Sequence, residues 1–175
     1  METKKGKIFG IALWVAIIGL ISVIFVFSGM VGAVSNEFSE PITDKVNSVV
    51  TSRIVTDLDQ RPAIDRFILK ERISIAVRKT AHITEFFLLG VLFLLRFRLY
   101  GAGNMRAALY SASACLFLAV FDEYHQTFIP GRYGCLEDVL VDFFGVVSGI
   151  LLCAAVIALV LRIKNKKTKK ELSSV

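Results

Sequence analysis

Ionisable side chains gather in two stretches of this sequence, each at the edge of a long apolar run. The first stretch, residues 78–90, reads RKTAHITEFFLLG and spaces Arg78, His82 and Glu85 four and three residues apart. On a helix this spacing places the three side chains on one face. The second stretch, residues 121–145, reads FDEYHQTFIPGRYGCLEDVLVDFFG and carries Asp122, Glu123, His125, Gln126, Arg132, Glu137, Asp138 and Asp142. These residue types suggest a polar pocket in an otherwise apolar protein.

Three kinds of chemistry are compatible with these side chains. Imidazoles and carboxylates are ligand types for a zinc-like divalent ion, and the candidate metal ligands are His82, Glu85, Asp122 and His125, although no established metal signature is present. A general acid–base centre with a phosphate-holding arginine is equally compatible, and its reactive groups would be His82, Glu85, Asp122, Glu123 and His125. The third is recognition of an anionic lipid headgroup, with candidate ligand-binding residues Arg78, Lys79, Gln126, Arg132, Asp138 and Asp142.

A structural role for the same residues competes with these functions. Arg78, Lys79 and Arg132 would neutralise the acids in a salt-bridge network that fixes the register of the helices. That role is favoured for any one residue. For the whole set a functional site is favoured, because ionisable groups inside a membrane are rare and cost several kcal/mol each unless paired. Ser28 is interpreted as a packing residue, since no nucleophile motif surrounds it.

The elements that must position these groups follow from hydropathy. The chain has 175 residues, 55% of them hydrophobic, and a mean hydropathy of +0.65, which is too apolar for an ordinary soluble domain. Residues 8–34 contain no charge and are long enough to cross about 30 Å of hydrocarbon. They exceed the roughly 7–15 apolar residues of a signal peptide, so we expect an uncleaved first span. The sequence predicts a single all-α domain with four transmembrane helices, at about 8–34, 78–97, 106–127 and 137–162.

The segment between the first two spans, residues 35–77, is predicted to be amphipathic. Apolar residues recur there at helical spacing on both sides of Pro62, which should interrupt a helix because proline lacks the backbone donor. Two amphipathic helices lying on the outer face of the bilayer are the simplest interpretation. A lid folded over the outer mouth of the bundle is the alternative.

Lysine and arginine predict the orientation of the spans. Arg96, Arg98 and Arg106 crowd the short loop after the second span without one acid, and the tail at 163–175 is strongly basic. We therefore expect both termini in the cytoplasm and the polar ends of the last three spans together at the outer surface. The net charge of +6 comes mainly from the tail and indicates anionic lipid as a partner, with no signal for nucleic acid. The three cysteines lie at different predicted depths, which argues against a disulfide framework.

The two polar stretches also resemble the VanZ-like family. The resemblance rests on motifs of the form K-x-x-H-x-x-E-[FY], D-E-x-x-Q-x-F-x-P-G-R and D-x-x-x-[ND]-x-x-G, which occur here in that order. The matching positions are Lys79, His82, Glu85, Asp122, Glu123, Gln126, Phe128, Pro130, Gly131, Arg132, Asp138, Asp142 and Gly145. Asp142 stands where many members have asparagine, which adds negative charge to the expected pocket.

The resemblance implies a multi-pass protein of the bacterial cell membrane and a setting in the cell envelope, without naming a reaction. The family takes its name from an accessory protein associated with resistance to the glycopeptide teicoplanin. We therefore expect an accessory protein that binds, or binds and modifies, a lipid-linked or glycopeptide-related ligand of the outer leaflet. The alternatives are a metal-assisted hydrolase of a lipid-linked envelope precursor, with a divalent metal as cofactor, and a non-catalytic membrane scaffold.

Overall fold

Four long helices build the part of the chain that the computed structural model describes, which is residues 4–29, 41, 44–46, 48–49, 63–130 and 132–172. They are α1 (Lys4–Ser28), α3 (Ala63–Leu99), α4 (Asn104–Gln126) and α5 (Leu136–Leu172), and no strand occurs within those ranges. Each helix contains a stretch that is long and apolar enough to cross a membrane. The predicted all-α bundle with four membrane-spanning helices is therefore confirmed.

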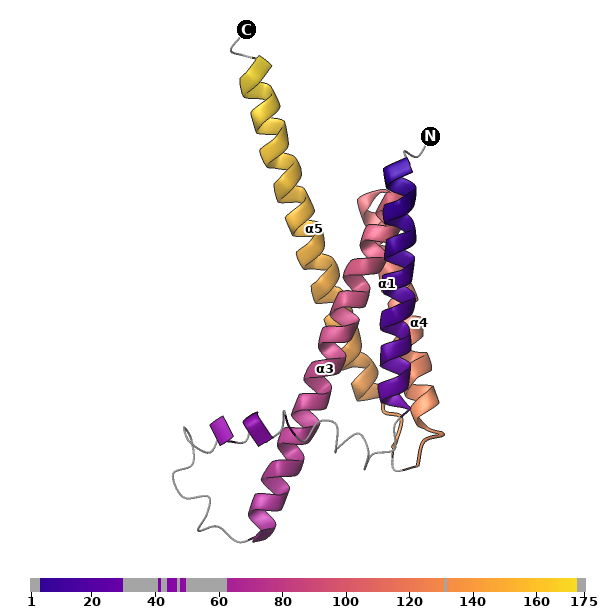
Figure 1. Cartoon of the computed structure of the whole chain (residues 1–175), viewed down its shortest axis with the longest axis vertical. Coiled ribbons are helices and arrows are strands. Elements are labelled where there is room, and N and C mark those ends of the chain that lie inside the picture. Colours follow the sequence, from indigo (N-terminus) through magenta and orange to yellow (C-terminus); the bar gives the residue numbers. More distant parts are fainter. Residues whose placement is uncertain are drawn as a thin grey trace.

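The helix α3 is the centre of the bundle, because it packs against each of the other three helices. Figure 1 shows that α3 and α5 cross and then diverge, whereas α1 and α4 run together along one side of α3. The first turns of α1 and the last turns of α5 lie at the same end of the molecule. The short connection between α4 and α5 lies at the opposite end, where the polar motifs are found.

Glycine residues bring the backbones of α3 and α5 into contact where they cross. A Cβ atom added to Gly145 of α5 would lie 2.5 Å from the carbonyl oxygen of Ile83 in α3. One turn along, Gly149 meets the carbonyl of Phe87, and Gly90 of α3 meets the backbone of Val146. Small residues allow such close approach of helices in a membrane, where van der Waals packing is the main source of association. The crossing therefore fixes α3 against α5 immediately beside the polar residues.

Apolar side chains from all four helices form the interior of the bundle. Its fully buried members include Ile17 of α1, Phe86 and Leu89 of α3, Ala119 of α4 and Val146 of α5. Many other large apolar side chains on every helix are exposed. Exposed apolar surface on this scale fits helices that face hydrocarbon, because a soluble monomer rarely exposes large contiguous apolar patches.

The boundaries of the second span differ from the prediction. Residues 63–77, assigned from the sequence to the outer amphipathic segment, continue into the span at 78–97 as the single helix α3. The physical reason is that no glycine or proline occurs between Ala63 and Leu89, so nothing interrupts the helix. The helix begins directly after Pro62 in the sequence, where an interruption was expected. The expected amphipathic helix before Pro62, and any lid that it would form, fall mostly outside the described residues.

Each of the other three predicted spans overlaps one helix, and the bounds of α4 differ from the predicted ones by no more than two residues. The helix α1 begins at Lys4 and ends at Ser28, and residues 30–34 of the expected first span are outside the described part. The helix α5 continues through most of the basic tail to Leu172. Most of the tail is thus an extension of the last helix, which Figure 1 shows projecting away from the bundle.

Candidate functional site

The glutamine Gln126, in the last turn of α4, is the centre of a polar network at the end of the bundle. Its side-chain Nε2 donates hydrogen bonds to Asp122 Oδ2 and to Glu123 Oε1, both at 3.0 Å. Its Oε1 accepts a hydrogen bond of 3.3 Å from Arg132 Nη1. Asp122, Glu123 and Gln126 are buried, and all three belong to the last two turns of α4. One amide therefore links two acids and one base.

The same network ties α1 and the α4–α5 connection to α4. Ser28 Oγ, at the end of α1, donates a hydrogen bond of 2.8 Å to Asp122 Oδ2. Arg132 Nη2 donates one of 3.3 Å to the carbonyl oxygen of Phe27. Glu123 Oε2 accepts one of 2.9 Å from the backbone N–H of Cys135. We call these residues, with Gln126, the α4 network.

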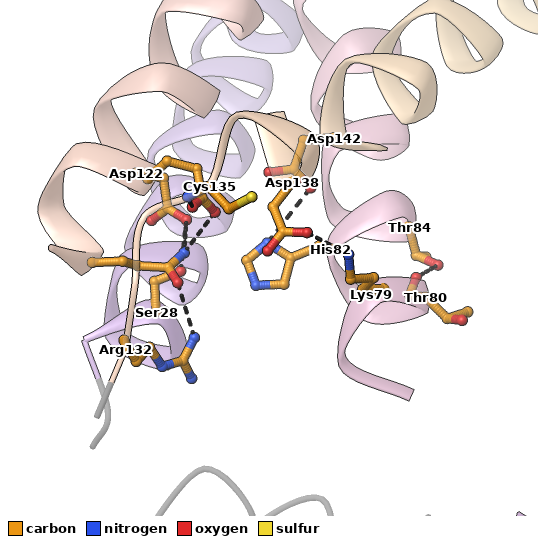
Figure 2. A network of polar contacts seen from close by, with 12 residues as sticks. Ser28, Lys79, Thr80, His82, Thr84, Asp122, Arg132, Cys135, Asp138 and Asp142 are labelled. Atoms are coloured by element: carbon orange, nitrogen blue, oxygen red, sulfur yellow. Dashed lines mark hydrogen bonds and ion pairs between the residues drawn. The ribbon is translucent and has the colours of Figure 1, made fainter. Parts of the chain in front are cut away.

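A second group of polar residues pairs α3 with α5. Lys79 Nζ lies 2.5 Å from Asp138 Oδ1, and the two form a half-exposed salt bridge. One turn deeper, His82 Nδ1 lies 3.6 Å from Asp142 Oδ1, within ion-pair range but beyond hydrogen-bond distance. The carboxylate of Asp142 is almost completely buried. Figure 2 shows this group facing Ser28, Asp122 and Arg132 of the α4 network.

A polar cavity of about 240 Å³ lies between the two groups. Most of the residues predicted for the site line this cavity, and three further residues join them. The lining consists of Ile75, Arg78, Lys79, His82, Glu123, Gln126, Arg132, Tyr133, Asp138, Val141 and Asp142. The structure thus brings the motifs of α3, α4 and α5 together around one cavity.

Two carboxylates next to the cavity each keep an oxygen atom without a hydrogen-bond partner among the described residues. They are Asp122 Oδ1 and Asp142 Oδ2, and both side chains are fully buried. A buried carboxylate oxygen without a donor is costly, so both acids have an oxygen atom that a ligand donor could bind. Asp122 does not line the cavity itself but lies behind Gln126, to which it is bonded.

Two predicted site residues lie elsewhere. His125 packs edge-to-face against Phe25 of α1, with ring centroids 5.7 Å apart, and does not line the cavity. Glu85 lines a different and mainly apolar hollow of about 730 Å³, together with Val46 and residues of α3 between Ile73 and Thr84. The spacing of the motifs predicted His125 and Glu85 as members of the site, whereas the structure places both outside the cavity lining.

The predicted metal ligands are separated by this arrangement. His82 is beside Asp142, His125 is at the interface of α1 and α4, and Glu85 is in the other hollow. Within the described part of the chain, no three or more His, Cys, Asp or Glu side chains are placed to hold a metal ion. The donor set therefore does not fit a divalent metal centre.

Two arginines give the cavity its capacity for an anion. Arg78 and Arg132 both line it, from α3 and from the α4–α5 connection. Partial burial, and then the like charge of Arg78, lowers the pKa of Arg132 from its ordinary value. A guanidinium group remains protonated at physiological pH, so the site keeps two neighbouring positive charges. An anion placed between them would be attracted by both.

Sequence reasoning missed Ser28 and Tyr133 as members of the site. Ser28 was interpreted as a packing residue, but its hydroxyl is fully buried and bonded to Asp122. Its position at the end of the first span, at the depth of the polar motifs, was the available signal. Tyr133, which follows Arg132 directly, lines the cavity, and its type and spacing carried no comparable signal.

Comparisons with known proteins assign the chain to a family. Searches of curated proteins and of solved structures returned no match. The family described as VanZ/LLP1 matches residues 13–160, which include all of α3 and α4, parts of α1 and α5, and every residue that lines the cavity. This match covers most of the chain, so the protein belongs to the VanZ/LLP1 family.

Proposed function

We propose that this protein is a cell-envelope accessory protein whose cavity binds the phosphate-bearing headgroup of a lipid-linked envelope intermediate. The observation that carries the proposal is the pair of arginines, Arg78 and Arg132, that line one small polar cavity. Lys79 is held by Asp138, so its charge is largely compensated. The two guanidinium groups are suited to a phosphate because each offers several donors in a fixed plane.

The size of the cavity supports a headgroup rather than a glycopeptide. Pockets that enclose drug-sized ligands measure about 300–1,000 Å³. The cavity of about 240 Å³ is smaller, which suits a phosphate and a small attached group. Any role in resistance to teicoplanin would then act through a lipid-linked ligand and not through antibiotic held in the cavity. The apolar hollow of about 730 Å³ beside α3 offers room for a lipid chain.

The basic residues support an outward-facing cavity. Arg96, Arg98 and Arg106 lie near the end of the bundle opposite the cavity, as do the lysines of the C-terminal part of α5. Basic residues near the ends of spans favour the cytoplasmic side. The cavity would then open toward the outer leaflet.

The His82–Asp142 pair favours a second candidate function, hydrolysis of the same lipid. Asp142 lies beside Nδ1 of His82, and the imidazole lines the cavity. A carboxylate that accepts a hydrogen bond from Nδ1 orients an imidazole, which then acts as a general base toward a water molecule, and closing the present gap of 3.6 Å would give this arrangement. Binding and hydrolysis share the two arginines, and hydrolysis alone needs the imidazole.

Lipid binding by the purified protein tests the proposal. The probe is a short-chain phosphatidic acid in detergent micelles, with phosphatidylcholine of the same chain length as the reference lipid. We expect Arg78→Gln and Arg132→Gln to weaken binding about 10–100-fold, because a hydrogen bond to a charged group contributes about 1.5–3 kcal/mol. The control is Arg72→Gln, on an exposed part of the same helix outside the cavity lining, which should bind as the wild type does.

Equal affinity of all variants for phosphatidic acid would refute the headgroup site. Folding of each variant is checked by size-exclusion chromatography. Arg132 also supports the α4 network, so Arg132→Gln could fail to fold, and the test then rests on Arg78→Gln. Hydrolysis is tested separately by measuring products with wild type and with His82→Gln. Binding without any product would refute hydrolysis and leave the binding proposal intact.

A further inference from the structure

The arginine Arg96 is almost completely buried at the end of the bundle opposite the cavity. Only 6% of its surface is exposed. Its guanidinium carbon lies 3.6 Å from the centroid of the Tyr100 ring and 5.5 Å from that of Trp14 in α1. Both distances are within the range of cation–π interactions. Aromatic rings from α1 and from the residue that follows α3 thus flank the cation.

Gly10 of α1 makes room for this guanidinium. A Cβ atom at Gly10 would lie 3.4 Å from Arg96 Nη1 and 3.3 Å from a methyl carbon of Leu99. The guanidinium group therefore packs directly against the backbone of α1 at this glycine. The enclosure therefore consists of one face of α1, carrying Gly10 and Trp14, and the last turn of α3.

Two donors of the enclosed guanidinium lack an acceptor. Arg96 Nε and Nη1 are buried, and neither has a hydrogen-bond partner among the residues that the structure describes. Stacking on rings involves the faces of a guanidinium group and leaves its N–H groups directed outward in its plane. A buried charged donor without an acceptor is costly, so the site is incomplete unless an anion supplies the acceptor oxygens.

We propose that Arg96, Trp14 and Tyr100 form a second lipid site, which holds the phosphate of an anionic phospholipid. The surroundings favour a membrane lipid as the source of the phosphate. Tyr100 follows the last residue of the span in α3, at the level where tryptophan and tyrosine line membrane interfaces. Basic residues at this end attract anionic lipid, and they include Lys4, Lys5, Lys7 and Arg98. The site is independent of the cavity at the other end.

The fluorescence of Trp14 reports on this site directly, because Trp14 is the only tryptophan of the protein. Purified protein in detergent micelles is titrated with a short-chain phosphatidylglycerol, with phosphatidylcholine of the same chain length and with inorganic phosphate. We expect a saturable change in the emission of the wild type with phosphatidylglycerol only. Arg96→Gln should abolish the change, and Arg96→Lys should raise the midpoint at least about tenfold, since lysine lacks the planar donors.

The matched control is Arg106→Gln, at the same end of the bundle but on an exposed position of α4. It removes one positive charge and should leave the midpoint within about twofold. An equal loss in Arg106→Gln would show attraction to surface charge alone and overturn the proposal. An equal response of the wild type to phosphatidylcholine or to inorganic phosphate would also overturn the proposal. If Arg96→Gln does not fold, the test rests on Arg96→Lys, and an unchanged midpoint in that variant would overturn the proposal.

Discussion

Two serines of α1 have different surroundings, and at the scale of the residue they give a matched comparison. Ser28 Oγ is buried and donates to Asp122, whereas Ser22 Oγ is exposed and donates to the carbonyl of Ile18 in its own helix. We expect Ser28→Ala to lower the free energy of unfolding by about 1–3 kcal/mol, because the buried carboxylate loses a donor. Ser22→Ala should change it by less than about 0.5 kcal/mol. Thermal unfolding in detergent measures both, and equal effects would contradict a stabilising role for the α4 network.

The site was predictable at this scale to the extent that helical spacing determines a face. Positions 122 and 126 lie one turn apart on α4 and therefore on the same face, and both belong to the α4 network. His125 lies at the edge of that face of α4, where its imidazole packs against Phe25 of α1. Spacing within one helix gives no information on which neighbouring helix covers each edge. The contacts of Ser28 and His125 with their partners therefore required the packing of α1.

At the scale of the element, the crossing of α3 and α5 determines whether His82 meets Asp142. Any side chain at Gly145 would force the backbones apart, since its Cβ would lie 2.5 Å from the carbonyl oxygen of Ile83. We expect Gly145→Ala to destabilise the protein by about 1–3 kcal/mol, as overpacking does elsewhere. It should also weaken lipid binding in the cavity, which needs residues of both helices.

The control is Gly19→Ala in α1, where an added Cβ would have no atom within 4 Å. Alanine forms helix better than glycine by roughly 1 kcal/mol, so this variant should be as stable as the wild type or slightly more stable. Thermal unfolding in detergent compares the two. If Gly145→Ala were as stable as Gly19→Ala, the close backbone contact of α3 with α5 would be wrong.

Hydropathy predicted the number of membrane-spanning helices because length and apolar content alone identify a span. It did not predict that α3 starts at Ala63. Charged and apolar residues alternate at helical spacing both in a helix lying on a membrane and in one that extends beyond it, so residues 63–77 fit both. The glycines at 145 and 149 did not predict the crossing of α3 and α5, because a glycine in a span does not indicate which other helix packs against it.

At the scale of the whole molecule, the two ends of the bundle differ in charge. One end has a cavity lined by both acids and bases. The other end has an enclosed arginine, further basic residues and the lysines of α5, with almost no acid nearby. This asymmetry is readable from the sequence, because the basic residues cluster at predicted span ends. The convergence of three helices on one cavity cannot be predicted from the sequence in this way, since it depends on how the helices cross.

That asymmetry predicts the orientation of the molecule in the membrane, and Cys135 makes the prediction testable. This cysteine is exposed beside the cavity, whereas Cys115 is buried and Cys153 is half-buried within α5. In a Cys115→Ser, Cys153→Ser background, we expect an impermeant maleimide to label Cys135 on intact cells, because basic loops favour the cytoplasm. In the same background with Cys135→Ser, Lys167→Cys in the basic tail is the control and should label only after lysis. Labelling of Cys135 only after lysis would place the cavity in the cytoplasm. An outer-leaflet ligand would then be refuted, and the Arg96 site would face the outer leaflet instead.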